Sequence, residues 1–336
     1  IPFKKRIYMT VYVECIVVAT SLIVAGLLVN RPADAFPIVR FVSNLSLSLK
    51  IDGLSMVFAG LVAALWPLAT LYSFEYMKHE KRERFFFMFY TITYGITLGI
   101  AFSEDMLTMY FFYEMLTLVT IPLVLHTFTR EAVLATRKYI YFSIGGAALG
   151  FMGMVFLVRY GDPSGFTLGG ILTGHTAGLG MDLVLLLYVI AFLGFSIKAA
   201  MFPFYSWLPD AGVAPTPVTA LLHAVAVVKA GAFAVIRLTY YCFGTELLRG
   251  TWAQNVVMVL AMFTVVFGCS MGVKETHMKR RLAFSTVSNL SYIIFGATIM
   301  TPAGLLGALC HMVFHAVMKI SAFFCSGSII HQSHKH

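Results

Sequence analysis

Three lysines and a glutamate stand in strongly apolar parts of this sequence. Lys198, Lys229 and Lys319 lie in the runs KAAMF, VVKAG and VMKIS, and Glu114 lies in MYFFYEMLTLVTIPL. A glutamate and a lysine that pair across buried helices keep one another charged. When such a pair separates, the desolvated lysine releases its proton more readily. Groups of this kind at these positions predict a site that moves protons.

Histidines accompany two of the lysines. His311, His315 and Lys319 are spaced four residues apart in HMVFHAVMK, so we expect them on one face of a helix. His223 precedes Lys229 by six residues. In a helix this spacing separates the two by about 9 Å along the axis and about 120° around it, so water would have to join them. Histidine suits a proton relay because its unperturbed pKa is about 6.5.

A helix break is expected beside Lys198. The apolar run over residues 181–211 is longer than the ~20 residues that cross a bilayer, and Pro203 and Pro209 lie near its end. A proline inside a helix removes a backbone hydrogen bond and clashes with the carbonyl four residues earlier. Broken backbone in a membrane is tolerated where it is buried in protein or lines water. The run therefore predicts a hydrated cavity beside Lys198, with a simple packing kink as the alternative for the prolines.

The composition indicates that a membrane surrounds these groups. Of 336 residues, 59% are hydrophobic and 12% are charged, and the mean hydropathy is +0.85. Soluble chains average about 25% charged residues. We expect an all-α polytopic bundle of about ten helices, because the chain lacks the alternating segments of about ten residues that form membrane barrels. The expected helices cover 7–29, 54–76, 84–103, 105–128, 132–160, 181–211, 216–243, 252–272, 281–300 and 302–330.

Basic residues predict the orientation of the bundle. Of the 24 Lys and Arg, fifteen lie at the two ends of the chain or in loops on that side, and five lie on the other side. Cytoplasmic loops carry an excess of Lys and Arg, so both ends are predicted to be cytoplasmic. Topology thus accounts for the net charge of +9 without nucleic-acid binding. The fifteen are Lys4, Lys5, Arg6, Lys78, Lys81, Arg82, Arg84, Arg130, Arg137, Lys138, Lys274, Lys279, Arg280, Arg281 and Lys335, and the five are Arg31, Arg40, Lys50, Arg159 and Arg249.

Three further ionisable groups in the expected helices receive a structural interpretation. Arg237 and His126 lie near helix ends, and Glu14 lies about seven residues into the first helix. For Arg237 and Glu14, snorkelling to the interface or a structural ion pair is the favoured explanation.

No cofactor or metal site is indicated in this chain. The five cysteines contain no CxxC pair, which leaves iron–sulfur ligation unsupported. Two functions other than ion transport stay open. The histidines could ligate haem in a membrane cytochrome, although this would leave three buried lysines unexplained. Alternatively, the chain could be a structural or cation-binding membrane subunit that conducts nothing.

Three blocks of the sequence resemble a known family. They are KAAMFPFYSWLPDAGVAPTPVTALLHAVAVVKAG, HMKRRLAFSTVSNLSYIIFG and HMVFHAVMKISAFFCSGSIIH. In order, spacing and letters they are similar to the antiporter-like subunits of respiratory complex I (NADH-quinone oxidoreductase), Mrp-type cation/proton antiporters and membrane-bound hydrogenases. The resemblance extends from IDGLSMVF at 51–58 to the end of the chain. Within it, PTPVTALLH and HAVMK are most similar to the distal subunit of complex I and the large subunit of Mrp antiporters.

The resemblance implies a fold of two inverted five-helix repeats, each with a broken helix. It divides the chain into N-terminal transmembrane helices at 1–83, a first repeat at 84–243 with its broken helix at 181–211, and an incomplete second repeat at 252–336. By this alignment the first helix corresponds to the family's second, and the chain ends before the second broken helix, which bears a terminal Lys or Glu in the family. We therefore expect the 336 residues to be part of a longer subunit.

The resemblance also implies roles for individual residues. Glu114 matches the glutamate that tunes the lysine of the first broken helix, which is Lys198, and Lys229 matches the connecting lysine on the next helix. His315 and Lys319 match the His and Lys of the helix that precedes the second broken one.

The expected function is translocation of protons, or exchange of Na⁺ for H⁺, by a subunit of a larger complex in a prokaryotic cytoplasmic membrane. Protons would reach Lys198 from the cytoplasm and pass through water, His223 and Lys229 towards His315 and Lys319. The expected partners are other membrane subunits, including paralogous antiporter-like ones, which would supply any redox energy. No cofactor is expected in this chain.

Overall fold

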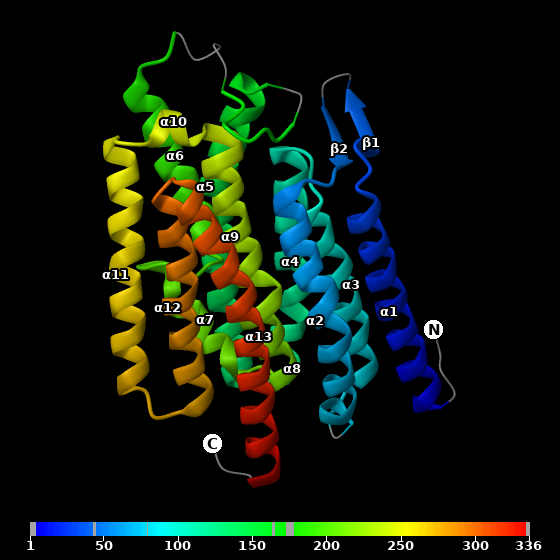
Figure 1. Cartoon of the computed structure of the whole chain (residues 1–336). Coiled ribbons are helices and arrows are strands. Elements are labelled where there is room, and N and C mark those ends of the chain that lie inside the picture. The colour runs from blue at the N-terminus through cyan, green and yellow to red at the C-terminus, as the bar shows by residue number, and fades with distance from the viewer. Residues whose placement is uncertain (1–4, 43–44, 79, 163–164, 173–177, 334–336) are drawn as a thin grey trace.

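Long helices that run between the same two ends make up most of this chain in the computed structural model (Figure 1). The structure describes residues 5–42, 45–78, 80–162, 165–172 and 178–333. In these residues, eight helices are long and apolar enough to cross a membrane. All ten expected spans contain helix, and the polytopic helical fold is confirmed. Lys4 and Lys335, two of the fifteen basic residues that predict the orientation, lie outside the described residues.

Eight of the expected spans are continuous helices, and two are interrupted. The continuous ones are α1 (Arg6–Asn30), α2 (Gly53–Met77), α3 (Glu83–Ala101), α4 (Met106–Val124), α5 (Arg130–Tyr160), α11 (Trp252–Lys274), α12 (Met278–Thr298) and α13 (Pro302–Ser333). The sixth span consists of α6 (Met181–Ser196), η1 (Phe204–Ser206), α7 (Trp207–Asp210) and η2 (Ala211–Val213). The seventh consists of α8 (Thr216–Ala220), η3 (Leu221–Val225), α9 (Val227–Arg237) and η4 (Leu238–Phe243), with α10 (Thr245–Leu248) after it.

Side-chain caps fix the starts of four long helices. In each, the residue before the helix accepts a hydrogen bond from the amide three positions on, which satisfies a backbone group that the helix itself leaves unpaired. The capping residues are Asp52 for α2, Asp105 for α4, Thr129 for α5 and Thr251 for α11. The two aspartates also place negative charge at the positive end of the helix dipole.

A β-hairpin, which the sequence pattern did not predict, connects α1 to α2. Strands β1 (Phe36–Val42) and β2 (Leu45–Leu49) pair antiparallel, with Phe36 opposite Leu49. The alternation of LSLSL fits the period of two of a strand. It is too short to be distinguished from a loop by pattern alone. The start of α1 and the end of α13 lie at one end of the bundle, which we term the basic end, and the hairpin lies at the other (Figure 1).

Central and peripheral helices differ in how much of their surface is covered. Residues 214–240 are all buried, so the seventh span is surrounded by protein. Outer helices instead expose large apolar side chains, such as Leu22 at 67% and Phe314 at 70%. Exposed apolar faces around a core that contains charged groups are typical of a membrane-embedded bundle.

Candidate functional site

The sixth span breaks immediately before Lys198. Helix α6 ends at Ser196, and turns carry the chain to Pro203, which is the N-cap of η1. Ala200 adopts a left-handed backbone conformation, with φ of 55°. The predicted break is therefore present, and Pro203 lies at its far end. Pro209 lies inside α7, outside the break.

Protein groups pair with the backbone that the break leaves open. The Trp207 indole donates to the Ile197 carbonyl at 2.9 Å, and the Tyr113 hydroxyl donates to the Phe195 carbonyl at 2.9 Å. The Phe202 amide donates to Thr264 Oγ1 at 3.1 Å. An interrupted helix inside a membrane needs such partners because unpaired backbone groups are costly there.

Lys198 meets Glu114 across the interface between the break and α4. The Nζ atom lies 3.7 Å from Glu114 Oε1, and the side chains are 2% and 28% exposed. At that distance the two groups attract one another without a hydrogen bond. Lys198 also donates to the Tyr113 carbonyl, and its Nζ lies 3.4 Å from the centroid of the Tyr113 ring. One stretch of α4 thus supplies a carboxylate, a carbonyl and an aromatic face to one ammonium group.

Tyr113 is a site residue that the sequence pattern did not indicate. It contacts Lys198 through its backbone carbonyl and its ring, and its hydroxyl holds the end of α6. A carbonyl acceptor carries no sequence signal, because every residue has one. The neighbouring FFYEM letters indicated an aromatic stretch but not which ring would face the lysine.

Lys229 makes direct contact with His315. The Lys229 Nζ and His315 Nδ1 atoms are 2.5 Å apart, across α9 and α13, and both residues are fully buried. No carboxylate lies within salt-bridge distance of either group among the described residues. Two basic groups this close cannot both carry a positive charge at low cost, so at most one of them is charged at a time.

His311 and Lys319 turn towards α12 instead. His311 Nε2 lies 3.1 Å from Asn289 Oδ1, and Lys319 Nζ donates to the Leu282 carbonyl at 3.1 Å. The rings of His311 and His315 stack with centroids 6.1 Å apart. The predicted stripe on α13 therefore exists, but its members have partners on two different helices. Asn289 is a further polar partner that the sequence pattern did not indicate.

His223 occupies a π-helical turn, η3, in the seventh span. The turn is marked by a hydrogen bond from the Ala226 amide to the Leu221 carbonyl at 2.9 Å. The His223 ring packs 4.9 Å from the Phe323 ring of α13, and neither ring nitrogen has a hydrogen-bond partner in the described part of the chain. Burying an unpaired imidazole is costly, and π-turns are frequent at functional sites, so packing alone does not explain this residue.

Gly231 allows close packing between the helix that carries Lys229 and the break that carries Lys198. A Cβ atom at this position would lie 2.5 Å from the Ala199 amide nitrogen and 3.1 Å from Lys198 Cβ. The helix that carries Lys229 therefore lies directly against the break that carries Lys198. No hydrogen bond links the two lysine centres in the described ranges.

Arg237 forms the structural ion pair that its position suggested. Its guanidinium donates to both carboxylate oxygens of Asp52 and to Ser55 Oγ at 3.0 Å. Burial acts to raise the pKa of Asp52, but the hydrogen bonds and charge of Arg237 outweigh it and lower that pKa below its ordinary value.

For Glu14, the described residues contain no salt-bridge partner. His126 lies just beyond α4, buried, with Nε2 2.9 Å from the Lys81 carbonyl oxygen.

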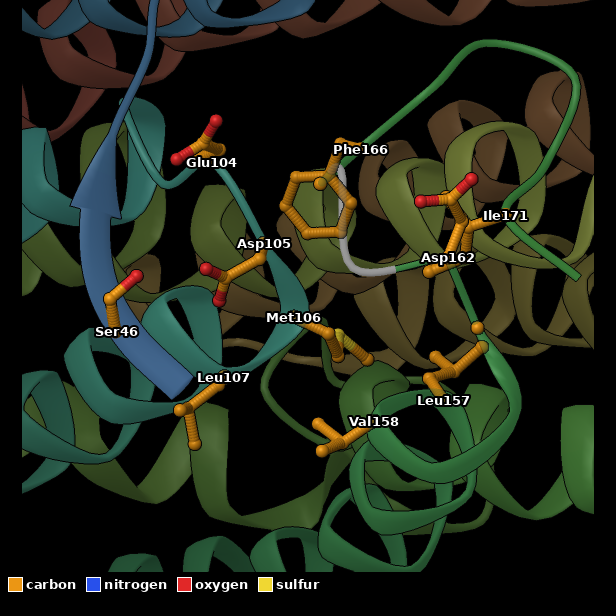
Figure 2. A pocket seen from close by; sticks show the side chains of 12 residues that line it. Ser46, Glu104, Asp105, Met106, Leu107, Leu157, Val158, Asp162, Phe166 and Ile171 are labelled. Carbon is orange, nitrogen blue, oxygen red and sulfur yellow. The ribbon is translucent and has the colours of Figure 1, made fainter. Parts of the chain in front are cut away.

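A small acidic cavity lies at the hairpin end of the bundle. It has a volume of about 100 Å³, and Glu104, Asp105 and Asp162 are among the residues around it (Figure 2). Burial raises the pKa of both Glu104 and Asp105. Glu114 follows Asp105 by nine residues on α4, about 13 Å along the helix. The cavity is thus separate from the lysine centres, and the described residues contain no cluster of three or more His, Cys, Asp or Glu placed to hold a metal.

Comparison with known proteins gives consistent matches. Residues 103–336 match the family described as NADH:quinone oxidoreductase/Mrp antiporter, transmembrane, and residues 41–87 match the N-terminal family of NADH-ubiquinone oxidoreductase (complex I) chain 5. The chain is 30% identical to the A subunit of the Na(+)/H(+) antiporter of Alkalihalophilus pseudofirmus, over 86% of this chain and 37% of that one. It is 31% identical to the chloroplastic NAD(P)H-quinone oxidoreductase subunit 5 of Amborella trichopoda, over 86% of this chain and 39% of that one.

Solved structures share the fold. A chain of the Mrp complex from Dietzia sp. DQ12-45-1b superposes with a TM-score of 0.85 at 23% identity, over 96% of this chain and 35% of that one. A chain of the archaeal membrane-bound sulfane sulfur reductase gives 0.79 at 22% identity, over 96% and 66%. This chain spans well under half the length of the two sequence relatives named above. The family resemblance inferred from the three sequence blocks is confirmed.

Proposed function

Because this chain belongs to the NADH:quinone oxidoreductase/Mrp antiporter transmembrane family, we propose that it translocates protons, or exchanges Na⁺ for H⁺, as a subunit of a larger membrane complex. Its relatives include subunits of a Na(+)/H(+) antiporter and of an NAD(P)H-quinone oxidoreductase, which supports this activity. We place it in a prokaryotic cytoplasmic membrane with the basic end in the cytoplasm. Partner membrane subunits would supply the driving energy.

The observation that carries the proposal is the contact between Lys229 and His315. Two buried basic groups 2.5 Å apart, with no salt-bridging carboxylate in the described part of the chain, can accept one excess proton between them but not two. A second positive charge arriving nearby repels that proton, because charges interact strongly in a low-dielectric interior. The proton then moves towards the neighbouring basic groups of α13, His311 and Lys319.

Glu114 and Lys198 act as the control point of this route. With Glu114 at 3.7 Å, the buried ammonium group has a counter-charge. If the carboxylate moves away, the Tyr113 carbonyl and ring still contact the ammonium but supply no full negative charge. Lys198 then loses its proton more readily. Helix α9 packs on the break through Gly231, so the backbone segments that carry the two centres are in contact.

A vesicle assay with the assembled complex tests the proposal. Lys198→Met and Lys229→Met each remove an ionisable group and keep an apolar stem of similar length. We expect each to reduce ion-driven pH change at least tenfold, measured with an entrapped pH-sensitive dye. Lys78→Met is the matched control, since Lys78 is half-exposed and pairs with Glu75 at 3.6 Å on the surface. Full transport in both core variants, with normal assembly on native gels, would favour a non-conducting structural subunit.

A further inference from the structure

An apolar groove runs between α1 and α3 at one edge of the bundle. It has a volume of about 510 Å³, within the range of about 300–1,000 Å³ found for small-molecule sites. Its walls include Met9, Val13 and Ile16 from α1 and Met88, Thr91 and Ile92 from α3. The Thr91 hydroxyl bonds to the carbonyl of Phe87 in its own helix, at 2.8 Å. The groove therefore suits a ligand made of hydrocarbon.

The mouth of the groove is positively charged. Arg84 lines it in the first turn of α3, and Lys5, the N-cap of α1, precedes the groove residue Met9 by one turn. Both helices start at the basic end and run in the same direction, so both positive helix ends meet there (Figure 1). The nearby Glu83 is neutralised by Arg6 at 2.7 Å.

We propose that this groove binds one acyl chain of an anionic phospholipid, with the phosphate held between Lys5, Arg84 and the two helix starts. Arg84 and Ile92 are eight residues apart, about 12 Å along α3, which is close to half of a hydrocarbon core of about 30 Å. An acyl chain from the leaflet at the basic end therefore fills the length of the groove. Anions bind readily at helix N-termini, and the added basic groups favour a charged headgroup over a zwitterionic one.

The lipid also has a structural task. α1 has a narrow buried stripe, consisting of Met9, Val13, Val17 and Val24. A chain held in the groove covers more of its surface and fixes it to α3. The inference depends on the membrane location of the bundle and not on ion translocation, so it can fail or hold independently of the proposed function.

Native mass spectrometry of the assembled complex, equilibrated with an equimolar mixture of phosphatidylglycerol and phosphatidylcholine, tests the proposal, with the subunit released in the gas phase to count its bound lipids. We expect at least fivefold preferential retention of one phosphatidylglycerol. The double variant Lys5→Gln/Arg84→Gln should lose this preference, while the charge-matched control Lys78→Gln/Arg130→Gln should keep it. Equal retention of both lipids by the unmodified chain, or an unchanged preference in Lys5→Gln/Arg84→Gln, would overturn the proposal.

A blocking variant separates the groove from the charges. Thr91→Trp places a bulky apolar side chain in the groove and leaves both basic residues in place. We expect it to retain helical content by circular dichroism and to lose the bound phosphatidylglycerol. Retention of that lipid in Thr91→Trp would contradict an acyl chain in the groove. So would a map of the intact assembly that shows a protein helix seated between α1 and α3.

Discussion

Two buried cations of this protein face carboxylates at almost identical exposure, yet they are held differently. In the Arg237–Asp52 pair the side chains are 1% and 28% exposed, and in the Lys198–Glu114 pair they are 2% and 28% exposed. Arg237 donates to both oxygens of Asp52 and to Ser55. Lys198 stands 3.7 Å from Glu114, beyond hydrogen-bond distance. Burial alone therefore does not determine whether a charge pair is fixed or movable.

Side-chain chemistry explains the difference. The planar guanidinium matches a carboxylate with two parallel bonds and does not lose its proton in proteins. The ammonium group is a point charge on a flexible stem, and it deprotonates when buried without a counter-charge. The fixed pair ties α9 to the start of α2, at the hairpin end of the bundle. The loose pair, Lys198 and Glu114, lies at a broken helix, where a small backbone movement changes the distance between the two charges.

Breaking the fixed pair should have the largest effect. Arg237→Met leaves Asp52 partly buried without its partner, which typically costs about 3–5 kcal/mol when a buried ion pair is broken. We expect a large fall in the yield of assembled protein and in its thermal unfolding temperature. Lys198→Met is the comparison variant and should assemble well. Equal stability of the two variants in a thermal unfolding assay would show that the pairs do not differ in structural role.

Lowering the pH should remove the stability that the Arg237–Asp52 pair contributes. The pKa of Asp52 is lowered in the folded protein, so its contribution to stability is complete above the ordinary Asp value of about 3.9. The contribution is lost as the pH falls through the lower folded value. We expect the stability of the unmodified protein to fall more steeply below about pH 4 than that of Asp52→Asn, in thermal scans from pH 7 to pH 3. Parallel curves would contradict the assignment.

Converting the loose pair into a fixed one sharpens the comparison. Lys198→Arg keeps the positive charge and can form two parallel bonds with Glu114, but arginine does not release its proton. We expect normal assembly together with at least a tenfold loss of translocation in the vesicle assay. Lys274→Arg, at the end of α11, is the control and should transport normally. Transport at the unmodified rate in Lys198→Arg would exclude proton release by this residue.

Much of the fold followed from the sequence because membrane spans have a strong signal. Runs of about 20 apolar residues and the proline-bearing run at 181–211 were sufficient to place the helices and the break. The β-hairpin was missed, since LSLSL is short. The π-turn at His223 was missed as well, because a single i→i+5 bond leaves no periodic trace in the residue types.

The sequence singled out the charged residues of the candidate site but could not predict their contacts. The charged residues stood out because apolar sequence surrounds them. Spacing placed His311, His315 and Lys319 on one face, but it could not show that His315 would meet Lys229 while the other two bonded to α12. Those contacts depend on the relative rotation of packed helices, which local sequence does not encode. The contact with the Tyr113 carbonyl could not be predicted either, because every residue has a backbone carbonyl.

The smallest expected effect concerns how Tyr113 supports the loose pair. Tyr113→Phe removes the hydroxyl that bonds to the Phe195 carbonyl at 2.9 Å and keeps the ring that faces Lys198. The Phe195 carbonyl, next to the break, then loses a buried partner, which costs about 1 kcal/mol. We expect a slightly lower unfolding temperature and a translocation rate changed by less than about fivefold, because the ammonium keeps its carbonyl, its ring and Glu114. Tyr241→Phe, beside Arg237 at 4.5 Å, is the matched control and should not alter translocation. If Tyr113→Phe abolished transport as completely as Lys198→Met, the hydroxyl would itself be a member of the proton route, and the loose pair would depend on the end of α6 more than on Glu114.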